Sequence, residues 1–244
     1  MKEALKNLPN LMTMGNLACG LIGIERVFAG EVNHALVVML IAAALDFFDG
    51  FTARLLGVDG EMGKQLDSLA DLVTFGVLPG IIFYQIAIQH DFCLPNGFCT
   101  SRYAWLFIPL GAAWRLARFN IDTRQSTGFL GTPTPITGTA LAFTWLAVQS
   151  QTGAGYSWIA EHIYLSRYFV LWAPLAAFYL MVSDLPMLAF KFKKGDVLLP
   201  WKIALIIALV AVAAIFQEAA GPLVLLVYVL LSLIANFVTV KQHG

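Results

Sequence analysis

Long apolar runs separated by short polar stretches constrain the fold of this chain more than any other feature. Several runs approach the roughly 20 residues that a helix needs to cross a bilayer. Backbone polar groups inside lipid must be satisfied within their own segment, so such runs form helices. Eight runs can be placed, at residues 10–29, 34–56, 64–89, 103–121, 134–150, 160–183, 201–217 and 221–240. With a mean hydropathy of +0.76, the sequence predicts an all-α, polytopic transmembrane helical bundle of about eight spans that forms a single domain over residues 1–244.

The lysines and arginines predict the orientation of these spans. Cytoplasmic loops of membrane proteins carry an excess of Lys and Arg. With a cytoplasmic N-terminus and eight alternating spans, 12 of the 15 Lys and Arg residues fall on the cytoplasmic side and 3 on the far side. This bias predicts an even number of spans with both termini cytoplasmic. Six spans with two re-entrant segments remain an alternative.

The charge and the cysteines bear on partners and compartment. The formal net charge is zero, so nothing favours a nucleic acid as partner. No cleavable signal peptide is expected, because the N-terminal stretch continues into the first span. Cys93 and Cys99 share a predicted outer loop, for which a disulfide and two free thiols both remain open.

Two pairs of aspartates stand near the ends of the second and third runs. Asp46 and Asp49 are three residues apart, and Asp67 and Asp71 are four apart, so each pair lies on one face of a helix. A carboxylate at membrane depth is costly and by default marks a functional site with a partner. Residues 46–71 contain only two Lys or Arg residues, so we expect metal to supply the missing positive charge. Clustered oxygen ligands suit Mg²⁺ or Mn²⁺, and two ions bridged by shared carboxylates would serve the transfer of a phosphoryl-type group.

Small residues and one cation accompany these aspartates. Gly50 and Ala53 follow the first pair on neighbouring turns, and Gly63 precedes Asp67 by one turn. Such residues let a ligand or another helix approach the backbone closely, and the pattern alone leaves both readings open. Arg54 is suited to a diphosphate oxygen, although an anchor at the cytoplasmic interface would also be arginine.

The spacing of these residues resembles, at every specified position, the signature of the CDP-alcohol phosphatidyltransferase family. In this chain it reads D-x-x-D-G-x-x-A-R, then eight residues, then G-x-x-x-D-x-x-x-D, from Asp46 to Asp71. The resemblance implies that the four aspartates bind two divalent ions, Mg²⁺ or Mn²⁺, which hold the diphosphate of a CDP-linked lipid. It also implies that Asp71 is the catalytic general base for the acceptor hydroxyl, and that CMP leaves.

The same resemblance implies a set of contacts to the CDP-lipid. The first span opens with polar residues spaced three apart, which could otherwise simply cap and solvate the helix end. With the small residues and the cation above, the implied set is Asn10, Thr13, Gly50, Ala53, Arg54 and Gly63.

Three further segments resemble the branch of bacterial and archaeal phosphatidylserine synthases. They are GKQLDSLADLVTFGVLP at 63–79, RLARFN at 115–120 and GTPTP at 131–135. The third segment often begins Leu-Pro in that branch, and this chain departs from it there. The resemblance implies CDP-diacylglycerol and L-serine as substrates, and a homodimer in a bacterial or archaeal cytoplasmic membrane with its active site on the cytoplasmic side.

Candidate contacts to the acceptor lie in the second and third segments. Arg115 and Arg118 could hold the carboxylate of serine as a bidentate pair, or they could anchor the helix at the interface. Asn120 and Thr134 are candidates for polar contacts. Glycerol 3-phosphate and inositol remain alternative acceptors within the family. An ion or metal transporter is the alternative outside it, although transporters place such ligands near the bilayer midplane.

Overall fold

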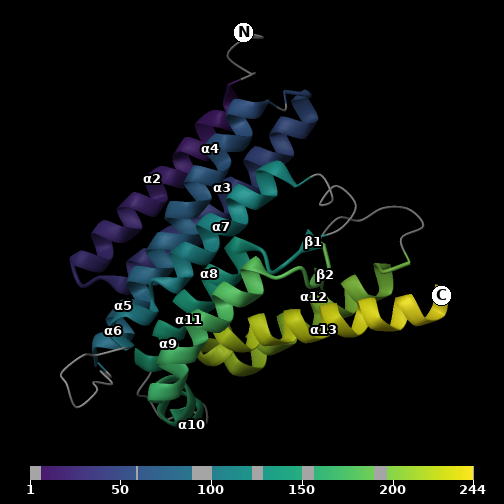
Figure 1. Ribbon diagram of the computed structural model, residues 1–244. Helices are drawn as coiled ribbons and strands as arrows, with labels where there is room; N and C mark the ends of the chain where they lie inside the picture. Colours follow the sequence, from purple (N-terminus) through teal and green to yellow (C-terminus); the bar gives the residue numbers. More distant parts are fainter. Residues whose placement is uncertain are drawn as a thin grey trace.

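The computed structural model describes residues 7–58, 60–89, 101–122, 129–149, 157–189 and 197–243, and nearly all of them are helical (Figure 1). The first half contains α2 (Leu8–Phe28), α3 (Val32–Leu56), α4 (Glu61–Asp71), the π-helix η1 (Leu72–Val77), α5 (Leu78–Gln89), α6 (Ser101–Ala104) and α7 (Phe107–Ile121). The second half contains α8 (Thr134–Ala142), α9 (Thr144–Gln149), α10 (Ser157–Ile159), the π-helix η3 (Ala160–Tyr164), α11 (Arg167–Val182), α12 (Leu199–Phe216), the 3₁₀ helix η4 (Gln217–Ala219) and α13 (Ala220–His243). The two strands, β1 (Phe129–Leu130) and β2 (Pro186–Met187), form a short antiparallel ladder.

The structure confirms that the fold is helical and that it contains helices able to cross a membrane, but not that there are eight spans. Each predicted run corresponds to a helix or to consecutive helices. In the described part of the chain, four segments are long and apolar enough to cross a membrane: Leu8–Phe28, Val32–Leu56, Glu61–Gln89 and Leu199–Thr239. A shorter apolar helix covers Arg167–Val182. Eight spans and cytoplasmic termini stay predictions, and Cys93 and Cys99 lie outside the described residues.

A tight connection between α3 and α4 brings the two aspartate pairs together. Gly57 ends α3 with φ +61°, and its N–H donates to the carbonyl of Ala53. This left-handed conformation favours glycine and terminates helices. The chain then returns as α4, η1 and α5, which form one continuous helical segment. The end of α3 and the start of α4 therefore lie at the same end of the bundle (Figure 1).

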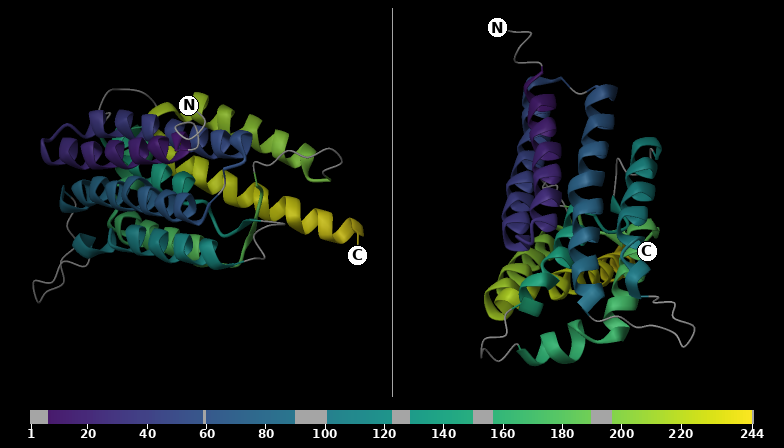
Figure 2. Two further views of the ribbon diagram at one scale, coloured as in Figure 1. Left: turned by 90° about the horizontal axis from the view of Figure 1, so that it is seen from above. Right: turned by 90° about the vertical axis from the view of Figure 1, so that its left-hand side faces the viewer.

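The N-terminal hairpin packs closely on this returning segment. Helices α2 and α3 run side by side, and α2 also contacts α4, η1 and α5 (Figure 2). A Cβ on Gly20 of α2 would lie 2.4 Å from Thr74 Oγ1 of η1, so only glycine allows this approach. A π-helical turn in a longer helix often marks a functional site, and η1 begins directly after Asp71.

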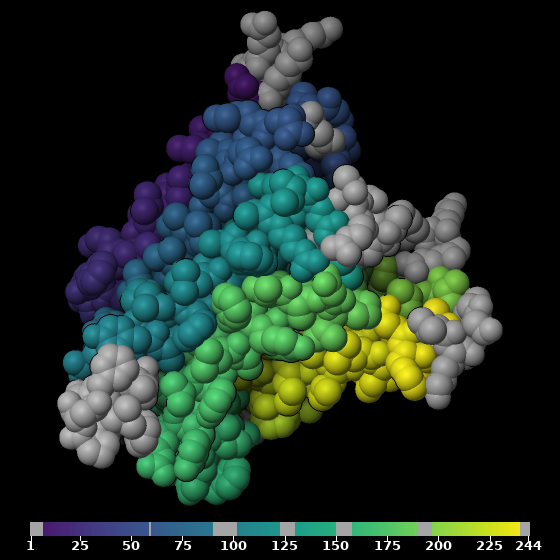
Figure 3. Space-filling view, in the orientation of Figure 1, coloured from purple at the N-terminus to yellow at the C-terminus, as the bar shows by residue number. Residues whose placement is uncertain are grey.

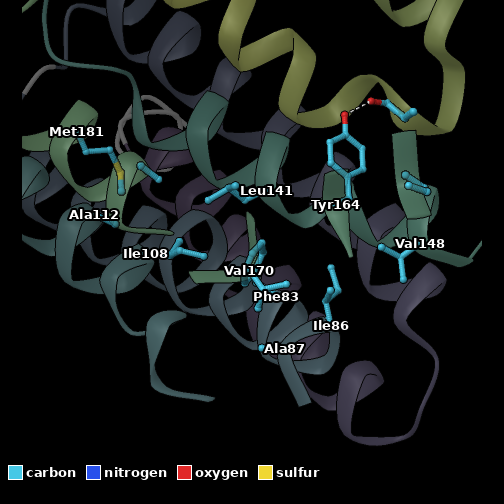
Figure 4. Packing of buried hydrophobic residues seen from close by; sticks show 14 residues of the cluster. Phe83, Ile86, Ala87, Ile108, Ala112, Leu141, Val148, Tyr164, Val170 and Met181 are labelled. Atoms are coloured by element: carbon cyan, nitrogen blue, oxygen red, sulfur yellow. Dashed lines mark hydrogen bonds between the residues drawn. The ribbon is translucent and has the colours of Figure 1, made fainter. Parts of the chain in front are cut away.

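A hydrophobic core lies between α5, α7, α9 and α11. Its buried side chains include Phe83, Ile86, Ile108 and Val170 (Figure 4). Tyr164 Oη donates to the carbonyl of Ala219 at 2.7 Å, the hydrogen bond drawn as a dashed line in Figure 4. The core thereby joins the middle helices to the turn between α12 and α13.

The C-terminal hairpin of α12 and α13 runs at a slant to the N-terminal helices (Figures 1 and 2). It borders α11 on the face drawn in Figure 3. Only 11% of the most apolar window in Leu199–Thr239 is buried. Two side chains of α13 bind Leu188, the residue directly after β2. Tyr228 Oη donates to the carbonyl of Leu188, and Ser232 Oγ accepts from the N–H of Leu188. The remaining apolar surface suits a lipid environment.

Candidate functional site

Four helix ends converge at one end of the molecule, namely the start of α2, the end of α3, the start of α4 and the end of α7 (Figure 1). They enclose a cavity of about 520 Å³. Its lining includes five of the six predicted CDP-lipid contacts: Asn10, Thr13, Gly50, Ala53 and Gly63. It also includes Lys64 and Phe119, which the sequence analysis did not assign to the site. Arg54, the sixth predicted contact, is not among the lining residues.

Three of the predicted metal ligands form a compact cluster at this cavity. Each of Asp46, Asp49 and Asp67 offers a carboxylate oxygen, and these oxygens all lie within 4.8 Å of one another. Asp49 and Asp67 line the cavity itself. Like charges at this separation repel strongly in a partly buried site. The cluster can hold a metal ion.

Asp71 lies directly behind this cluster. Its side chain is buried, and its charge interacts with that of Asp46. Asn16 Nδ2 of α2 donates to Asp71 Oδ1 at 3.4 Å. The structure therefore brings the predicted general base next to the predicted metal ligands, with a partner from α2 that the sequence did not reveal.

Thr13 links α2 to the first aspartate pair. Its Oγ1 donates to Asp49 Oδ2 at 2.6 Å and lies 3.0 Å from the carbonyl of Pro9. A short hydrogen bond to a carboxylate is a strong one, so Thr13 fixes the orientation of Asp49. Thr13 therefore contacts the carboxylate cluster as well as lining the cavity where the CDP-lipid was predicted.

The two motif glycines have different surroundings. A Cβ on Gly63 would lie 3.1 Å from Asn10 Oδ1, so the small residue allows α2 and α4 to approach. A Cβ on Gly50 would meet only Arg54 Nη1, at 3.6 Å. Gly50 thus leaves open space in the cavity, and the guanidinium of Arg54 lies near that opening.

Arg115 and Thr134 meet close to Asp71. The Arg115 side chain is buried, and its Nη1 donates to Thr134 Oγ1 at 3.2 Å. The charge of Arg115 also interacts with that of Asp71. These two predicted acceptor contacts therefore lie together beside the predicted base.

The structure places Arg118 away from that group. Its guanidinium forms an ion pair with Asp184 and donates from Nη1 to the carbonyl of Val182 at 3.0 Å. Its Nε lies 3.6 Å from Asp122 Oδ2. Arg118 thus joins the end of α7 to the segment after α11.

Asn120 connects α7 with α4. Its side chain exchanges hydrogen bonds with Ser68 and donates to Gln65 Oε1 at 3.2 Å. Its backbone carbonyl accepts from Lys64 Nζ at 2.7 Å. These contacts join α7 to the part of α4 that lines the cavity, and none of them lies at Asp71, where the acceptor substrate is predicted to bind.

Asn16 contacts the predicted base but is not assigned to the site by the sequence. The sequence predicts helix caps or nucleotide contacts for the polar residues at the start of the first span. A signal was nevertheless present, because Asn10, Thr13 and Asn16 recur every three residues and therefore share a face of an otherwise apolar helix. That face lies against the aspartates of α3 and α4.

Comparison with known proteins decides the family. The model of the family described as CDP-alcohol phosphatidyltransferase matches residues 6–240. The chain belongs to the CDP-alcohol phosphatidyltransferase family. Together with the four apolar segments, this membership indicates an integral membrane protein of phospholipid biosynthesis.

Proteins similar to this chain come from bacteria and from an archaeon. The chain is 36% identical over 136 residues to a CDP-diacylglycerol–serine O-phosphatidyltransferase of Bacillus subtilis, which is 55% of this chain and 72% of the relative. It is 32% identical over 193 residues to the protein of that name in Mycobacterium leprae, 75% of this chain and 58% of the relative. It is 33% identical over 160 residues to an archaetidylserine synthase of Methanothermobacter thermautotrophicus, 64% of this chain and 65% of the relative. The match thus spans less than two thirds of the second and third relatives.

Proposed function

We propose that this chain transfers the phosphatidyl group of CDP-diacylglycerol to the hydroxyl of L-serine, giving phosphatidylserine and CMP. The observation that carries the proposal is the meeting of three features at one end of the bundle: a cavity, a carboxylate cluster and the buried Arg115 beside Asp71. The names of the similar bacterial proteins support serine as the acceptor.

The residues present fit a pair of divalent cations, Mg²⁺ or Mn²⁺. The donor set consists of carboxylate oxygens, which these hard cations prefer, and a buried amide oxygen of Asn16 beside them has no hydrogen-bond partner in the described part of the chain. Asp46, Asp49, Asp67 and Asp71 would hold the ions. When bound, such ions neutralise the diphosphate and stabilise the departing CMP.

The cavity would hold the CDP moiety. Gly50 leaves space on its wall, and Asn10 and Gly63 bring α2 and α4 together at its mouth. Arg54 near Gly50 offers a cation to a diphosphate oxygen. The acyl chains would then extend along the exposed apolar faces of the neighbouring helices.

Asp71 would act on the acceptor. One of its carboxylate oxygens takes the proton of the serine hydroxyl, and the hydroxyl oxygen attacks the phosphorus that carries the lipid. Arg115 binds the serine carboxylate, while Thr134 keeps the guanidinium in place. Because Arg118 is engaged with Asp122 and Asp184, we assign it to the support of this site rather than to a direct contact.

We also propose the finer topology. Eight spans with both termini in the cytoplasm would place this site on the cytoplasmic side, as the distribution of Lys and Arg favours. A homodimer in a bacterial or archaeal cytoplasmic membrane would cover part of the exposed apolar surface. Native mass spectrometry of the protein in lipid nanodiscs should then give twice the chain mass of 26.7 kDa, and a single chain mass would rule the dimer out.

The test of the activity is CMP release from CDP-diacylglycerol by the purified protein. Serine, glycerol 3-phosphate, inositol and no acceptor are compared, each with Mn²⁺, with Mg²⁺ and with EDTA. Release that requires both serine and a divalent ion is the expected result. Release with another acceptor would discard the role of Arg115, and the absence of release from folded protein would discard the transferase.

A further inference from the structure

Asn16 is held firmly beside Asp71. It lies on α2, and its side chain is fully buried, with 0% of its surface exposed. Thr74 Oγ1 of η1 donates to its backbone carbonyl at 3.2 Å. The residue is thus fixed between α2 and the π-helical turn that follows Asp71.

The carboxamide of Asn16 uses only one of its two polar atoms. Nδ2 donates to Asp71 Oδ1 at 3.4 Å, whereas Oδ1 is buried and has no hydrogen-bond partner among the described residues. Nearly all buried polar atoms in native proteins have a partner, and one without a partner calls for an explanation such as an ion or a water.

The surroundings of Oδ1 favour a cation. Oδ1 and Nδ2 share one carbon atom, so the oxygen lies beside Asp71. Asp71 interacts with Asp46, whose carboxylate belongs to the compact cluster with Asp49 and Asp67. Ionised carboxylates accept hydrogen bonds and cannot donate them, so they cannot satisfy an amide oxygen. Amide carbonyl oxygens are ordinary ligands of hard divalent cations.

We infer that Asn16 Oδ1 is a protein ligand of the divalent cation held beside Asp71, in addition to the four aspartates. This inference rests on the proposed metal use of the cluster. It assigns to α2 a direct part in the metal site, which would otherwise be built by α3 and α4 alone. Binding of the ion would then draw α2, α3 and α4 together.

Two variants separate metal ligation from the mere orientation of Asp71. Asn16→Leu removes both the oxygen and the Nδ2 donor at similar volume. Asn16→Asp keeps an oxygen ligand but removes the donor to Asp71. Mn²⁺ binding is measured by isothermal titration calorimetry and by the loss of the free Mn²⁺ signal in electron paramagnetic resonance, on the full chain in detergent without substrate.

The expected result is a Mn²⁺ dissociation constant raised roughly 10- to 100-fold in Asn16→Leu, and one close to or below the wild-type value in Asn16→Asp. Equal weakening in both variants would overturn the inference, because it would show that only the Nδ2 donor matters. An unchanged constant in Asn16→Leu would overturn it as well. If the leucine variant does not fold, Asn16→Ala takes its place in the same comparison.

Thr144→Val is the matched control. Thr144 Oγ1 is also buried without a hydrogen-bond partner in the described part of the chain, but it lies on α9, which contributes no residue to the cavity or to the carboxylate cluster. Its replacement should leave Mn²⁺ binding unchanged. If the wild-type protein binds no Mn²⁺, the proposed metal function itself is wrong. If the wild-type protein binds Mn²⁺ and the Asn16 variants bind it equally well, only the role of Asn16 as a ligand is wrong.

Discussion

At the residue scale, the hydrogen bond from Thr13 to Asp49 makes a direct prediction. Thr13→Val removes the donor 2.6 Å from Asp49 Oδ2 while keeping the shape of the side chain. We expect the Mn²⁺ dissociation constant to rise roughly 10- to 100-fold, as for other groups that orient metal ligands. Calorimetric titration measures it. Thr239→Val is the control. Like Thr13 Oγ1, Thr239 Oγ1 lies within hydrogen-bond distance of the carbonyl oxygen four residues back, at 2.8 Å, but it lies far along α13 and contacts no aspartate of the cluster. Equal effects in both variants would contradict the role of Thr13.

The second prediction at this scale concerns the proposed base. Asp71→Asn keeps an oxygen near the cluster and removes the proton acceptor. Loss of a general base costs about 10²- to 10⁴-fold in rate, so CMP release should fall at least about 10²-fold while CDP-diacylglycerol still binds. Single-turnover CMP release and equilibrium binding of the CDP-lipid are measured side by side. Turnover at the wild-type rate would remove Asp71 as the base.

The sequence revealed the charged part of the site and little of its polar support. Aspartates in an apolar chain stand out, because burial of a carboxylate is costly wherever it occurs. A threonine or an asparagine in a helix has many ordinary explanations, so the contacts of Thr13 and Asn16 became visible only in three dimensions. The pairing of Arg118 with Asp184, 66 residues further on, depends on the packing of α7 against α11 and could not be predicted from spacing.

At the element scale, the packing of α8 on η1 can be tested by a single methyl group. A Cβ on Gly138 would lie 2.0 Å from the carbonyl oxygen of Phe75, and a backbone atom cannot move aside. Gly138→Ala should lower the stability by about 1–3 kcal/mol and reduce CMP release, because η1 follows Asp71. The thermal unfolding midpoint in detergent and the rate of CMP release are the measurements.

Gly23→Ala provides the comparison for this variant. Its Cβ would also make a close contact, at 2.6 Å, but with the terminal Cδ2 of Leu78, which is the end of a flexible side chain. We therefore expect a smaller loss of stability. Equal losses in the two alanine variants would show that η1 yields as easily as a leucine side chain, and the tight packing of α8 would not matter.

The long apolar runs located the helices well because every such run in a membrane must satisfy its own backbone. It did not locate the π-helical turns. The same residues can form an α-helix, and the choice depends on contacts such as Thr74 with Asn16 and Gly138 with Phe75. The slant of α12 and α13 could not be predicted either, since the contacts of this hairpin join residues far apart in the sequence, such as Tyr228 and Ser232 with Leu188.

At the scale of the whole molecule, the distribution of Lys and Arg predicts which side each loop faces. In a variant that lacks the native cysteines, Lys241→Cys should react with a membrane-impermeant maleimide only after the cells are opened. Arg167→Cys should react in intact cells. If both cysteines were labelled from the same side of the membrane, the proposed topology would be wrong, because it places residue 167 outside and residue 241 in the cytoplasm.

Removal of divalent ions should loosen the whole N-terminal half. Without cations, the aspartates at the ends of α3 and α4 repel one another across the junction that joins these helices to α2. Ligand that binds only the folded state stabilises it by about 2.7 kcal/mol at 100 times its dissociation constant, so Mn²⁺ added after EDTA should raise the thermal unfolding midpoint and the effect should saturate. The same rise with NaCl at matched ionic strength would point to general screening instead.

Asp67→Asn removes one carboxylate of the cluster. The rise of the thermal unfolding midpoint should then require higher Mn²⁺ concentrations, and a variant with the wild-type dependence on Mn²⁺ would exclude Asp67 from the metal site.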